Sequence, residues 1–208
     1  MPVTINGDGS ITGLSVGGLP NGTVDADTLA SNAVTTAKIA NNAVTVDKAS
    51  GSVKGIEMVD QWRITSTKSN FGQSVFDSNW ERNDLNSNKI GSAGMSESSG
   101  VFTFPTTGKY LVIAFGYATG NNDRYMGIWI ERTVDGGSNW TRGAEGYGSA
   151  YNSGNSTFSQ VSIQYFFHVT NTSTHKIRLK SDNVGTCNWD GASNIMRTGF
   201  TFIRMGDA

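Results

Sequence analysis

Residues 100–119 read GVFTFPTTGKYLVIAFGYAT, and this stretch decides the fold that the sequence predicts. It contains two runs of aromatic and β-branched residues, which favour strands, separated by Pro105 and Gly108, which favour a turn. Proline lacks the backbone N–H that a strand interior needs, so the first run ends at Pro105. We therefore expect strands at 100–105 and 108–119, joined as a tight antiparallel hairpin.

The second of these strands is apolar on both faces. One face carries Leu111, Ile113, Phe115 and Tyr117, and the other carries Tyr110, Val112 and Ala114. An antiparallel strand normally turns one face to water, so the second apolar face needs a cover. Either the chain's own loops or a partner subunit would supply it.

Similar strand patterns flank this segment. Further strands are expected at 56–65, 124–133, 157–170, 175–181 and 194–205. In the run 157–170, Val161, Ile163, Tyr165, Phe167 and Val169 share one face, as in a half-buried strand. No segment has a sustained helical period, and the 26 glycines favour turns. The sequence therefore predicts an all-β, two-sheet jelly-roll sandwich over residues 56–208, which we call the knob.

A ten-residue repeat precedes the knob in residues 21–55. Its first position holds valine, its second holds a helix N-cap type (Asp25, Thr35, Thr45), and the next five hold one helical turn at most. Two apolar anchors per decad cannot enclose a core, because the conformational entropy lost on ordering ten residues exceeds the free energy gained by burying two side chains. We therefore expect a thin multi-chain shaft, with a disordered Ala/Thr/Asn linker as the alternative. The shaft anchors are Val24, Leu29, Val34, Ile39 and Val44.

Charge and hydropathy exclude two classes of partner. The formal net charge of -1 gives no positive field for a phosphate backbone, so no nucleic-acid partner is expected. No stretch approaches the roughly 18 apolar residues of a membrane span, and the N-terminus lacks the pattern of a signal peptide, so no membrane insertion is expected. The single Cys187 has no partner for an internal disulfide.

The motifs of catalysis and metal binding are missing from the sequence. It contains no HExxH, CxxC or G-x-S-x-G motif, and pairing Glu131 with Glu145 as glycosidase acids has little support. We therefore expect no enzyme activity, no catalytic residue, no metal and no cofactor. Four aspartates could supply oxygen ligands to a calcium ion: Asp123, Asp135, Asp182 and Asp190. We interpret them instead as solvated turn residues.

Aromatic residues lie among Gly, Asn and Ser in several segments expected to be loops. They are Trp80, Trp140, Tyr147, Tyr151 and Trp189. A flat ring flanked by amide and hydroxyl groups suits the face of a sugar, and the same composition is typical of adaptable protein-binding loops. Sealing the edge of the sandwich is an equally good interpretation of each residue alone. We expect Trp140, Tyr147, Tyr151 and Trp189 as possible receptor-facing residues.

Two segments resemble the C1q and tumour-necrosis-factor superfamily. Residues 100–110, GVFTFPTTGKY, match its signature pattern G-x-F-x-x-P-x-x-G-x-Y, and residues 197–203, RTGFTFI, resemble its final strand. The resemblance implies a ten-strand jelly roll that trimerises and spans about residues 56–206. No collagen stalk precedes it, and the Gly-rich loops are not typical of the family. The calcium-binding and receptor-contact residues of the animal proteins therefore cannot be transferred.

The decads resemble those of fibre proteins from bacterial viruses, particularly marine ones. The repeats NGTVDADTLA (21–30) and AVTTAKIANNAVTVDKA (33–49) are similar to those preceding knobs in tail fibres, and residues 79–105 are similar to such knobs. The resemblance implies a homotrimeric virion fibre, assembled in the bacterial cytoplasm. Residues 1–20 would bind a virion tail or head protein, and the knob would bind host polysaccharide or protein. A head fibre, decoration or adaptor protein remains open, as does, with less support, a glycan depolymerase.

Overall fold

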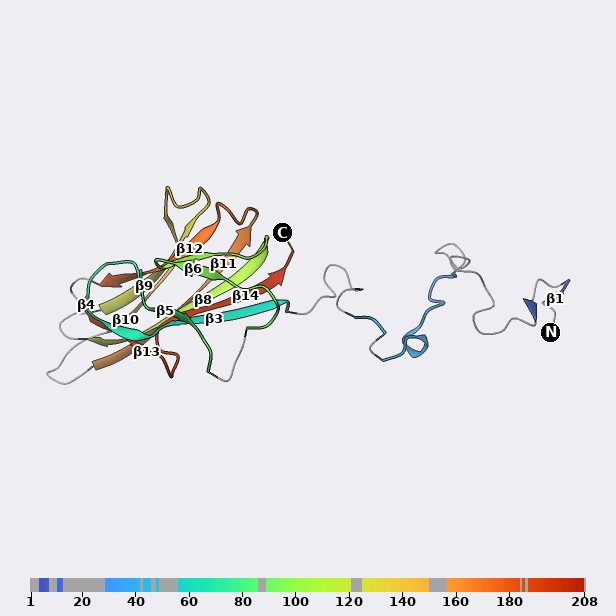
Figure 1. Cartoon of the computed structure of the whole chain (residues 1–208), viewed down its shortest axis with the longest axis horizontal. Helices are drawn as coiled ribbons and strands as arrows, with labels where there is room; N and C mark the ends of the chain where they lie inside the picture. Colours follow the sequence, from blue (N-terminus) through green and yellow to red (C-terminus); the bar gives the residue numbers. More distant parts are fainter. Residues whose placement is uncertain are drawn as a thin grey trace. The chain divides into compact units, whose positions relative to one another are not determined.

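The computed structural model describes residues 4–7, 11–12, 29–41, 43–45, 48, 56–85, 89–120, 125–149, 157–183, 185 and 187–207. The chain divides into two compact units, Met1–Ala49 and Ser50–Ala208. This division lies a few residues before the boundary predicted at residue 55. Figure 1 labels most of their elements.

The described residues of the N-terminal unit form three short elements. Strand β1 (Thr4–Ile5) pairs with β2 (Ile11–Thr12) in an antiparallel ladder. A single 3₁₀ turn, η1 (Thr36–Lys38), follows Thr35, whose side chain makes no capping hydrogen bond. One turn in the middle decad is what the repeat predicted, although the backbone closes it without help from the expected N-cap side chain.

The decads form the same hydrogen bonds at an interval of ten residues. The Ala33 N–H donates to the Ala30 carbonyl at 2.9 Å, and Ala43 repeats this bond to Ala40 at 3.0 Å. The two lysines also repeat each other. Lys38 bonds the Thr35 carbonyl through its N–H and the Ala33 carbonyl through its ammonium group, and Lys48 does the same with Thr45 and Ala43. The sequence repeat is therefore a structural repeat in the described decads.

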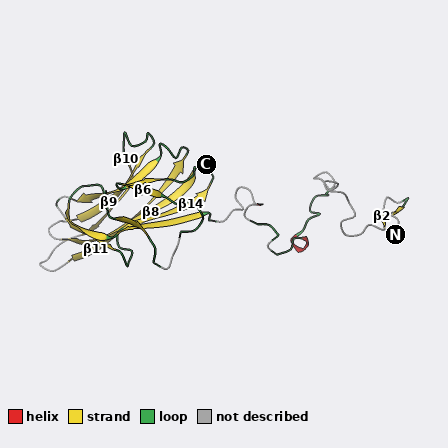
Figure 2. Ribbon diagram, in the orientation of Figure 1, coloured by secondary structure: helices red, strands yellow, loops and turns green. Residues whose placement is uncertain are grey.

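The described residues of the knob form two antiparallel sheets, whose strands are drawn in yellow in Figure 2. The larger sheet has the order β4-β13-β8-β14-β3-β5, with β11 paired along β8, and the smaller sheet has the order β10-β9-β12-β7-β6. The strands are β3 (Met58–Ile64), β4 (Ser66–Phe71), β5 (Trp80–Arg82), β6 (Ser96–Ser98), β7 (Val101–Thr103), β8 (Gly108–Gly120), β9 (Tyr125–Thr133), β10 (Thr141–Ser149), β11 (Thr157–Val169), β12 (Lys176–Asn183), β13 (Cys187–Ala192) and β14 (Gly199–Gly206). The predicted all-β sandwich is confirmed.

The predicted hairpin between 100–105 and 108–119 is wrong. Strand β7 pairs with β6 and β12 in the smaller sheet, whereas β8 pairs with β11, β13 and β14 in the larger one. The turn therefore crosses between the sheets. Phe104 explains this path, because its ring is buried 4.7 Å from the ring of Tyr110 and so occupies the interior between the layers. The Tyr110 hydroxyl donates to the Thr106 carbonyl at 2.9 Å and fixes the turn.

An aromatic cluster fills the core between the sheets. The ring of Phe102 on β7 lies 4.9 Å from Trp80, 5.3 Å from Phe200 and 5.3 Å from Phe202, all on strands of the larger sheet. Ring pairs at these separations add about 0.5–1.5 kcal/mol beyond the burial of their area. The predicted alternation in β11 is also confirmed, because its apolar face is buried or half-buried and Ser162 and Gln164 are exposed.

Glycines let β10 pack directly onto β11 and close one side of the sandwich. A Cβ atom on Gly146 would lie 2.4 Å from Cγ2 of Ile163 and 3.1 Å from Cγ1 of Val161, which is closer than side chains approach. On the same inner face, a Cβ on Gly148 would lie 2.4 Å from the hydroxyl of Ser159. The two strands can come this close only because these positions lack side chains.

The substitution Gly146→Val tests this packing. We expect it to lower the free energy of unfolding by about 1–3 kcal/mol, because three carbon atoms must enter a filled space. The matched control is Gly206→Val, where nothing lies within 4 Å of the added Cβ. Its expected effect is within about 0.5 kcal/mol. Urea denaturation of both variants measures the difference, and equal losses would contradict the close packing.

Candidate functional site

The outer face of the larger sheet carries a band of apolar side chains, which we call the apolar face. Its members are Val59, Leu111, Ile113, Phe115, Tyr117, Phe158, Phe166 and Ile203. Register places Leu111 beside Phe166 on one side and Ile203 on the other, and Ile203 beside Val59, so four strands contribute one continuous row. Phe158 and Phe166 are 60% and 57% exposed. The described loops of the chain therefore leave much of this face open.

The apolar face ends at a hollow of about 290 Å³. It is lined by Tyr117, Gln160, Ile195, Met196 and Arg197. The Arg197 guanidinium lies 5.8 Å from the ring centre of Tyr117, and Phe158 stacks on the same ring at 5.9 Å. The hollow belongs to the same surface as the exposed aromatic rings, so a partner that covers one also reaches the other.

The shaft anchors are exposed within the N-terminal unit. Leu29, Val34, Ile39 and Val44 are between 41% and 56% exposed. The fifth anchor, Val24, lies outside the described residues. Burial of these anchors by other copies of the chain stays a prediction.

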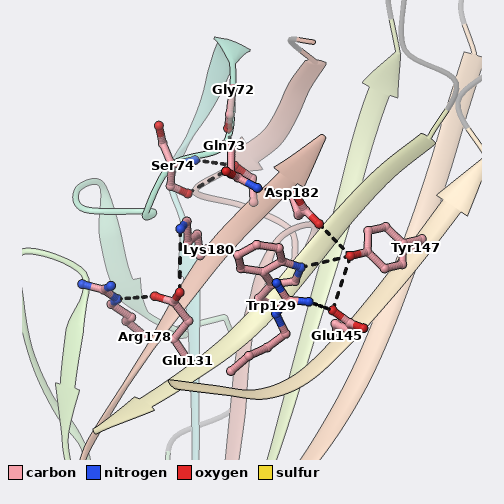
Figure 3. A network of polar contacts seen from close by, with 12 residues as sticks. Gly72, Gln73, Ser74, Trp129, Glu131, Glu145, Tyr147, Arg178, Lys180 and Asp182 are labelled. Carbon is pink, nitrogen blue, oxygen red and sulfur yellow. Dashed lines mark hydrogen bonds and ion pairs between the residues drawn. The ribbon is translucent and has the colours of Figure 1, made fainter. Parts of the chain in front are cut away.

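The outer face of the smaller sheet carries a network of aromatic and charged side chains, which we call the aromatic–charge cluster (Figure 3). Its members are Gln73, Trp129, Glu131, Trp140, Arg142, Glu145, Tyr147, Arg178, Lys180 and Asp182. Alternation along β9, β10 and β12 brings eight of them to one side, and Gln73 and Trp140 join them from neighbouring segments. In successive rows, Trp129 lies between Glu145 and Lys180, and Gly127 lies between Tyr147 and Asp182.

Cations enclose the buried members of this cluster. The Arg142 guanidinium lies 3.5 Å from the ring centre of Trp129, and the Lys180 ammonium lies 4.9 Å from it, so the indole is only 8% exposed. The Glu131 carboxylate is bound by Arg178 at 2.7 Å and Lys180 at 3.8 Å. Each of these charges therefore has an opposite charge or an aromatic face beside it, which offsets the cost of removing it from water.

Tyr147 connects the cluster through its hydroxyl. The hydroxyl donates to the Asp182 carboxylate at 2.6 Å and accepts a hydrogen bond from the indole N–H of Trp129 at 3.3 Å, as Figure 3 shows. The hydrogen bond to Asp182 raises the pKa of Tyr147 above its ordinary value, and burial of the hydroxyl acts in the same direction. The protonated phenol is therefore the form that the fold favours.

This pKa shift predicts a late-ionising tyrosine. Because the folded pKa is raised, the contribution of the phenol to stability is complete below a pH of about 10 and is lost as the pH rises through the folded pKa. Absorbance titration of the wild type should show one tyrosine that ionises after an ordinary one. Tyr147→Phe should remove that component, and Asp182→Asn should lower its pKa. A titration in which Tyr147→Phe removes only an ordinary component would contradict the assignment.

The aromatic residues that were predicted to face a receptor do not all lie on one surface of the structure. Trp140 and Tyr147 lie on the outer side of the smaller sheet, where the Arg178 guanidinium stacks 4.1 Å from the ring centre of Trp140. The prediction that Trp189 faces a receptor is wrong. This residue lies in β13 with no exposed surface and packs in the core. Trp80 also packs against the core, from β5. Tyr151 lies outside the described residues.

Sequence reasoning named Glu131, Glu145 and Asp182 only as candidates for other chemistry and did not predict the cluster around Tyr147. Trp129 and Lys180 looked like ordinary strand residues, and Arg142 lay in a segment expected to be a loop. The alternation of Tyr125, Gly127, Trp129 and Glu131 along 124–133 was the signal that could have marked this face. Among the described residues, no group of three or more His, Cys, Asp or Glu is arranged to hold a metal ion. In that same part of the chain, no helix is long and apolar enough to span a membrane.

The comparisons with known proteins concern the fold of the knob. No family model and no curated protein matches the sequence. Among solved structures, the chain is similar to the Eiger TNF of S. frugiperda, with 13% identity, a TM-score of 0.53, and coverage of 74% of this chain and 96% of that one. Murine APRIL at pH 8.5 has 14% identity and a TM-score of 0.48, covering 71% of this chain and 98% of its own. The knob therefore has a jelly-roll fold of the C1q and tumour-necrosis-factor type.

Proposed function

We propose that this chain is a homotrimeric virion fibre of a bacterial virus. Residues 1–20 attach it to a tail or head protein of the particle, residues 21–55 form a shaft, and the knob, residues 56–208, binds polysaccharide or protein on the host cell surface. The protein acts by binding rather than by catalysis, and it resides in the virion after assembly in the bacterial cytoplasm.

The apolar face carries the assembly part of the proposal. Soluble monomers seldom expose a continuous apolar surface of this kind, and closed rotational symmetry lets identical copies cover it for one another. Phe158 and Phe166 stand on β11 and are each more than half exposed, so they are available to a neighbouring copy. Three copies, rather than two, follow from the sequence resemblance to a superfamily whose knobs trimerise.

The decads support the same assembly independently. Their hydrogen bonds recur every ten residues while Leu29, Val34, Ile39 and Val44 stay exposed, so a single chain gains little from ordering this segment. Three chains in register would bring the corresponding anchors together at each step. A shaft of this kind needs no core of its own, because each repeat packs only against the other chains.

Trimerisation also fits a binding role. Three linked copies raise the effective concentration of each site, so single-site dissociation constants of about 1 mM are sufficient for firm attachment. The carboxylates that a glycosidase would use are already ion-paired: Glu131 is held by Arg178 and Lys180, and Glu145 is held by Arg142. A depolymerase has less support than a binding protein for this reason.

The proposal is tested by adsorption of the labelled, purified chain to bacterial cells of the host. We expect saturable binding of the trimer to cells, no release of oligosaccharides from their envelopes, and labelling of virus particles by antibodies against the knob. Particle labelling without adsorption would overturn the host-binding role and identify a head fibre, decoration or adaptor protein. Release of oligosaccharides would identify a depolymerase, and unlabelled particles would overturn the virion assignment.

A further inference from the structure

The ring of Tyr147 lies over a glycine on the outer face of the smaller sheet. Tyr147 on β10 is directly opposite Gly127 on β9. A Cβ atom on Gly127 would lie 2.5 Å from Cδ1 and 2.6 Å from Cε1 of the tyrosine, so the ring occupies the space that a side chain would fill. Tyr147 is nevertheless 47% exposed. The ring is thus supported by the sheet on one side and open to solvent on the other.

Neighbouring groups fix this ring in place before any ligand arrives. Its hydroxyl is held between Asp182 and Trp129, and the ring of Tyr125 meets it nearly at right angles, with 5.3 Å between the centres. A side chain held in this way loses little conformational freedom on binding, which favours affinity. Polar groups surround it: Asp182 itself, the exposed Gln73 that donates to the Asp182 carboxylate, and Glu145, whose side chain is 43% exposed.

We propose that Tyr147 is the platform for one neutral pyranose unit of a host-surface glycan, an inference that rests on the host-binding function proposed above. The C–H bonds on one face of a pyranose are weakly positive, and they suit the negative face of an aromatic ring. The hydroxyl groups at the rim of the sugar then reach the exposed carboxylate of Glu145, while the buried carboxylate of Asp182 holds the ring. A carboxylate accepts about four hydrogen bonds, so Glu145 keeps acceptor capacity beyond its present partners.

The charges beside the ring select a neutral sugar over an acidic one. Glu145 and Asp182 flank the ring, so a uronate or sialate carboxylate placed there would face two negative charges. The nearest cations are already engaged. Arg142 pairs with Glu145 and stacks on Trp129, and Lys180 is directed to Trp129 and Glu131. Sugar hydroxyls, which donate to carboxylates, avoid this repulsion.

Titration of the full-length chain with defined oligosaccharides tests the inference. The probes are maltohexaose, cellohexaose and mannohexaose as neutral sugars, and an alginate hexamer as the acidic one, followed by calorimetry and saturation-transfer NMR. We expect at least one neutral hexamer to bind with a dissociation constant of about 1 mM per site and the alginate hexamer to bind at least about tenfold more weakly. Absence of binding by all three neutral probes at tens of millimolar would overturn the proposal.

Three variants distinguish the contribution of the Tyr147 ring to binding from that of its hydrogen bonds. Tyr147→Ala, which removes the platform, and Gly127→Ala, whose methyl group would meet both the ring and the Asp182 carbonyl, should each weaken binding about tenfold or more. Tyr147→Phe keeps the ring and should stay within about threefold of the wild type. The matched control Val134→Ser alters an equally exposed residue, 47%, beyond the other end of β9 and should change nothing. Equal binding by the wild type and Tyr147→Ala would contradict the inference.

Cell adsorption distinguishes a failure of this inference from a failure of the proposed function. If Tyr147→Ala adsorbs to host cells as well as the wild type does, the platform is not the receptor site and the host-binding function still stands. If the wild type binds a neutral hexamer but does not adsorb to cells, the proposed function fails while the sugar site remains. An unchanged native mass and unfolding midpoint verify that each variant is folded.

Discussion

Replacing Trp189 with alanine is expected to lower the free energy of unfolding of the knob by about 3–5 kcal/mol. The indole is fully buried between the sheets, 5.8 Å from the ring of Phe76. It also packs onto the backbone of β8, because a Cβ on Gly116 would lie 2.4 Å from its Cζ3 atom. Truncation to alanine therefore leaves a cavity that rigid strands cannot collapse to fill.

Trp140→Ala is the matched control for this substitution. Trp140 is half-buried on the outer side of the smaller sheet, where its main described contact is the guanidinium of Arg178. Loss of that contact should cost only about 0.5–2 kcal/mol. Urea denaturation followed by circular dichroism measures both losses. A loss for Trp140→Ala as large as that for Trp189→Ala would contradict the assignment of one residue to the core and the other to the surface.

The substitution Leu111→Asp is expected to convert the assembly into folded single chains. Leu111 is at the centre of the apolar face, between Phe166 and Ile203. In a symmetric trimer each copy would bury one unpaired carboxylate, at a cost of about 3–5 kcal/mol per site. In a free monomer the same side chain reaches water, so the fold should be retained.

Val101→Asp provides the control for the apolar face. Val101 is also half-buried in a strand, but β7 belongs to the smaller sheet, whose outer face carries charged residues. This variant should keep the native mass of the wild type. Light scattering coupled to gel filtration measures both masses, and circular dichroism verifies the β structure. A Leu111→Asp variant with unchanged mass would show that the apolar face is not the subunit interface.

The strands that sequence patterns predicted are those whose own residues favour a strand. The runs behind β3, β8, β9 and β11 are rich in aromatic and β-branched residues, and the alternation predicted for β11 matches the burial that the structure shows. The double apolar character of β8 was also visible, because its outer residues are no less hydrophobic than its inner ones. The composition of a segment was sufficient to predict a strand wherever it agreed with the environment of that segment in the folded protein.

The missed strands depend on their neighbours instead. Strand β10 reads TRGAEGYGS and β13 reads CNWDGA, compositions typical of loops, yet pairing with β9 and β8 makes both of them strands. Trp189 was misassigned for this reason, since its turn-forming neighbours pointed to an exposed loop. The false hairpin at residues 104–107 has a related cause. A turn between two strands has the same local sequence pattern whether the strands belong to one sheet or to two different sheets. Only the packing of the strands distinguishes these two cases.

The native mass of the full-length chain tests the central claim most directly. Sedimentation equilibrium at micromolar concentration should give three times the 22.2 kDa of one chain, and the mass should be unchanged on tenfold dilution. A folded chain with the mass of a single copy, in which the shaft anchors and Phe166 remain exposed to water, would contradict the account.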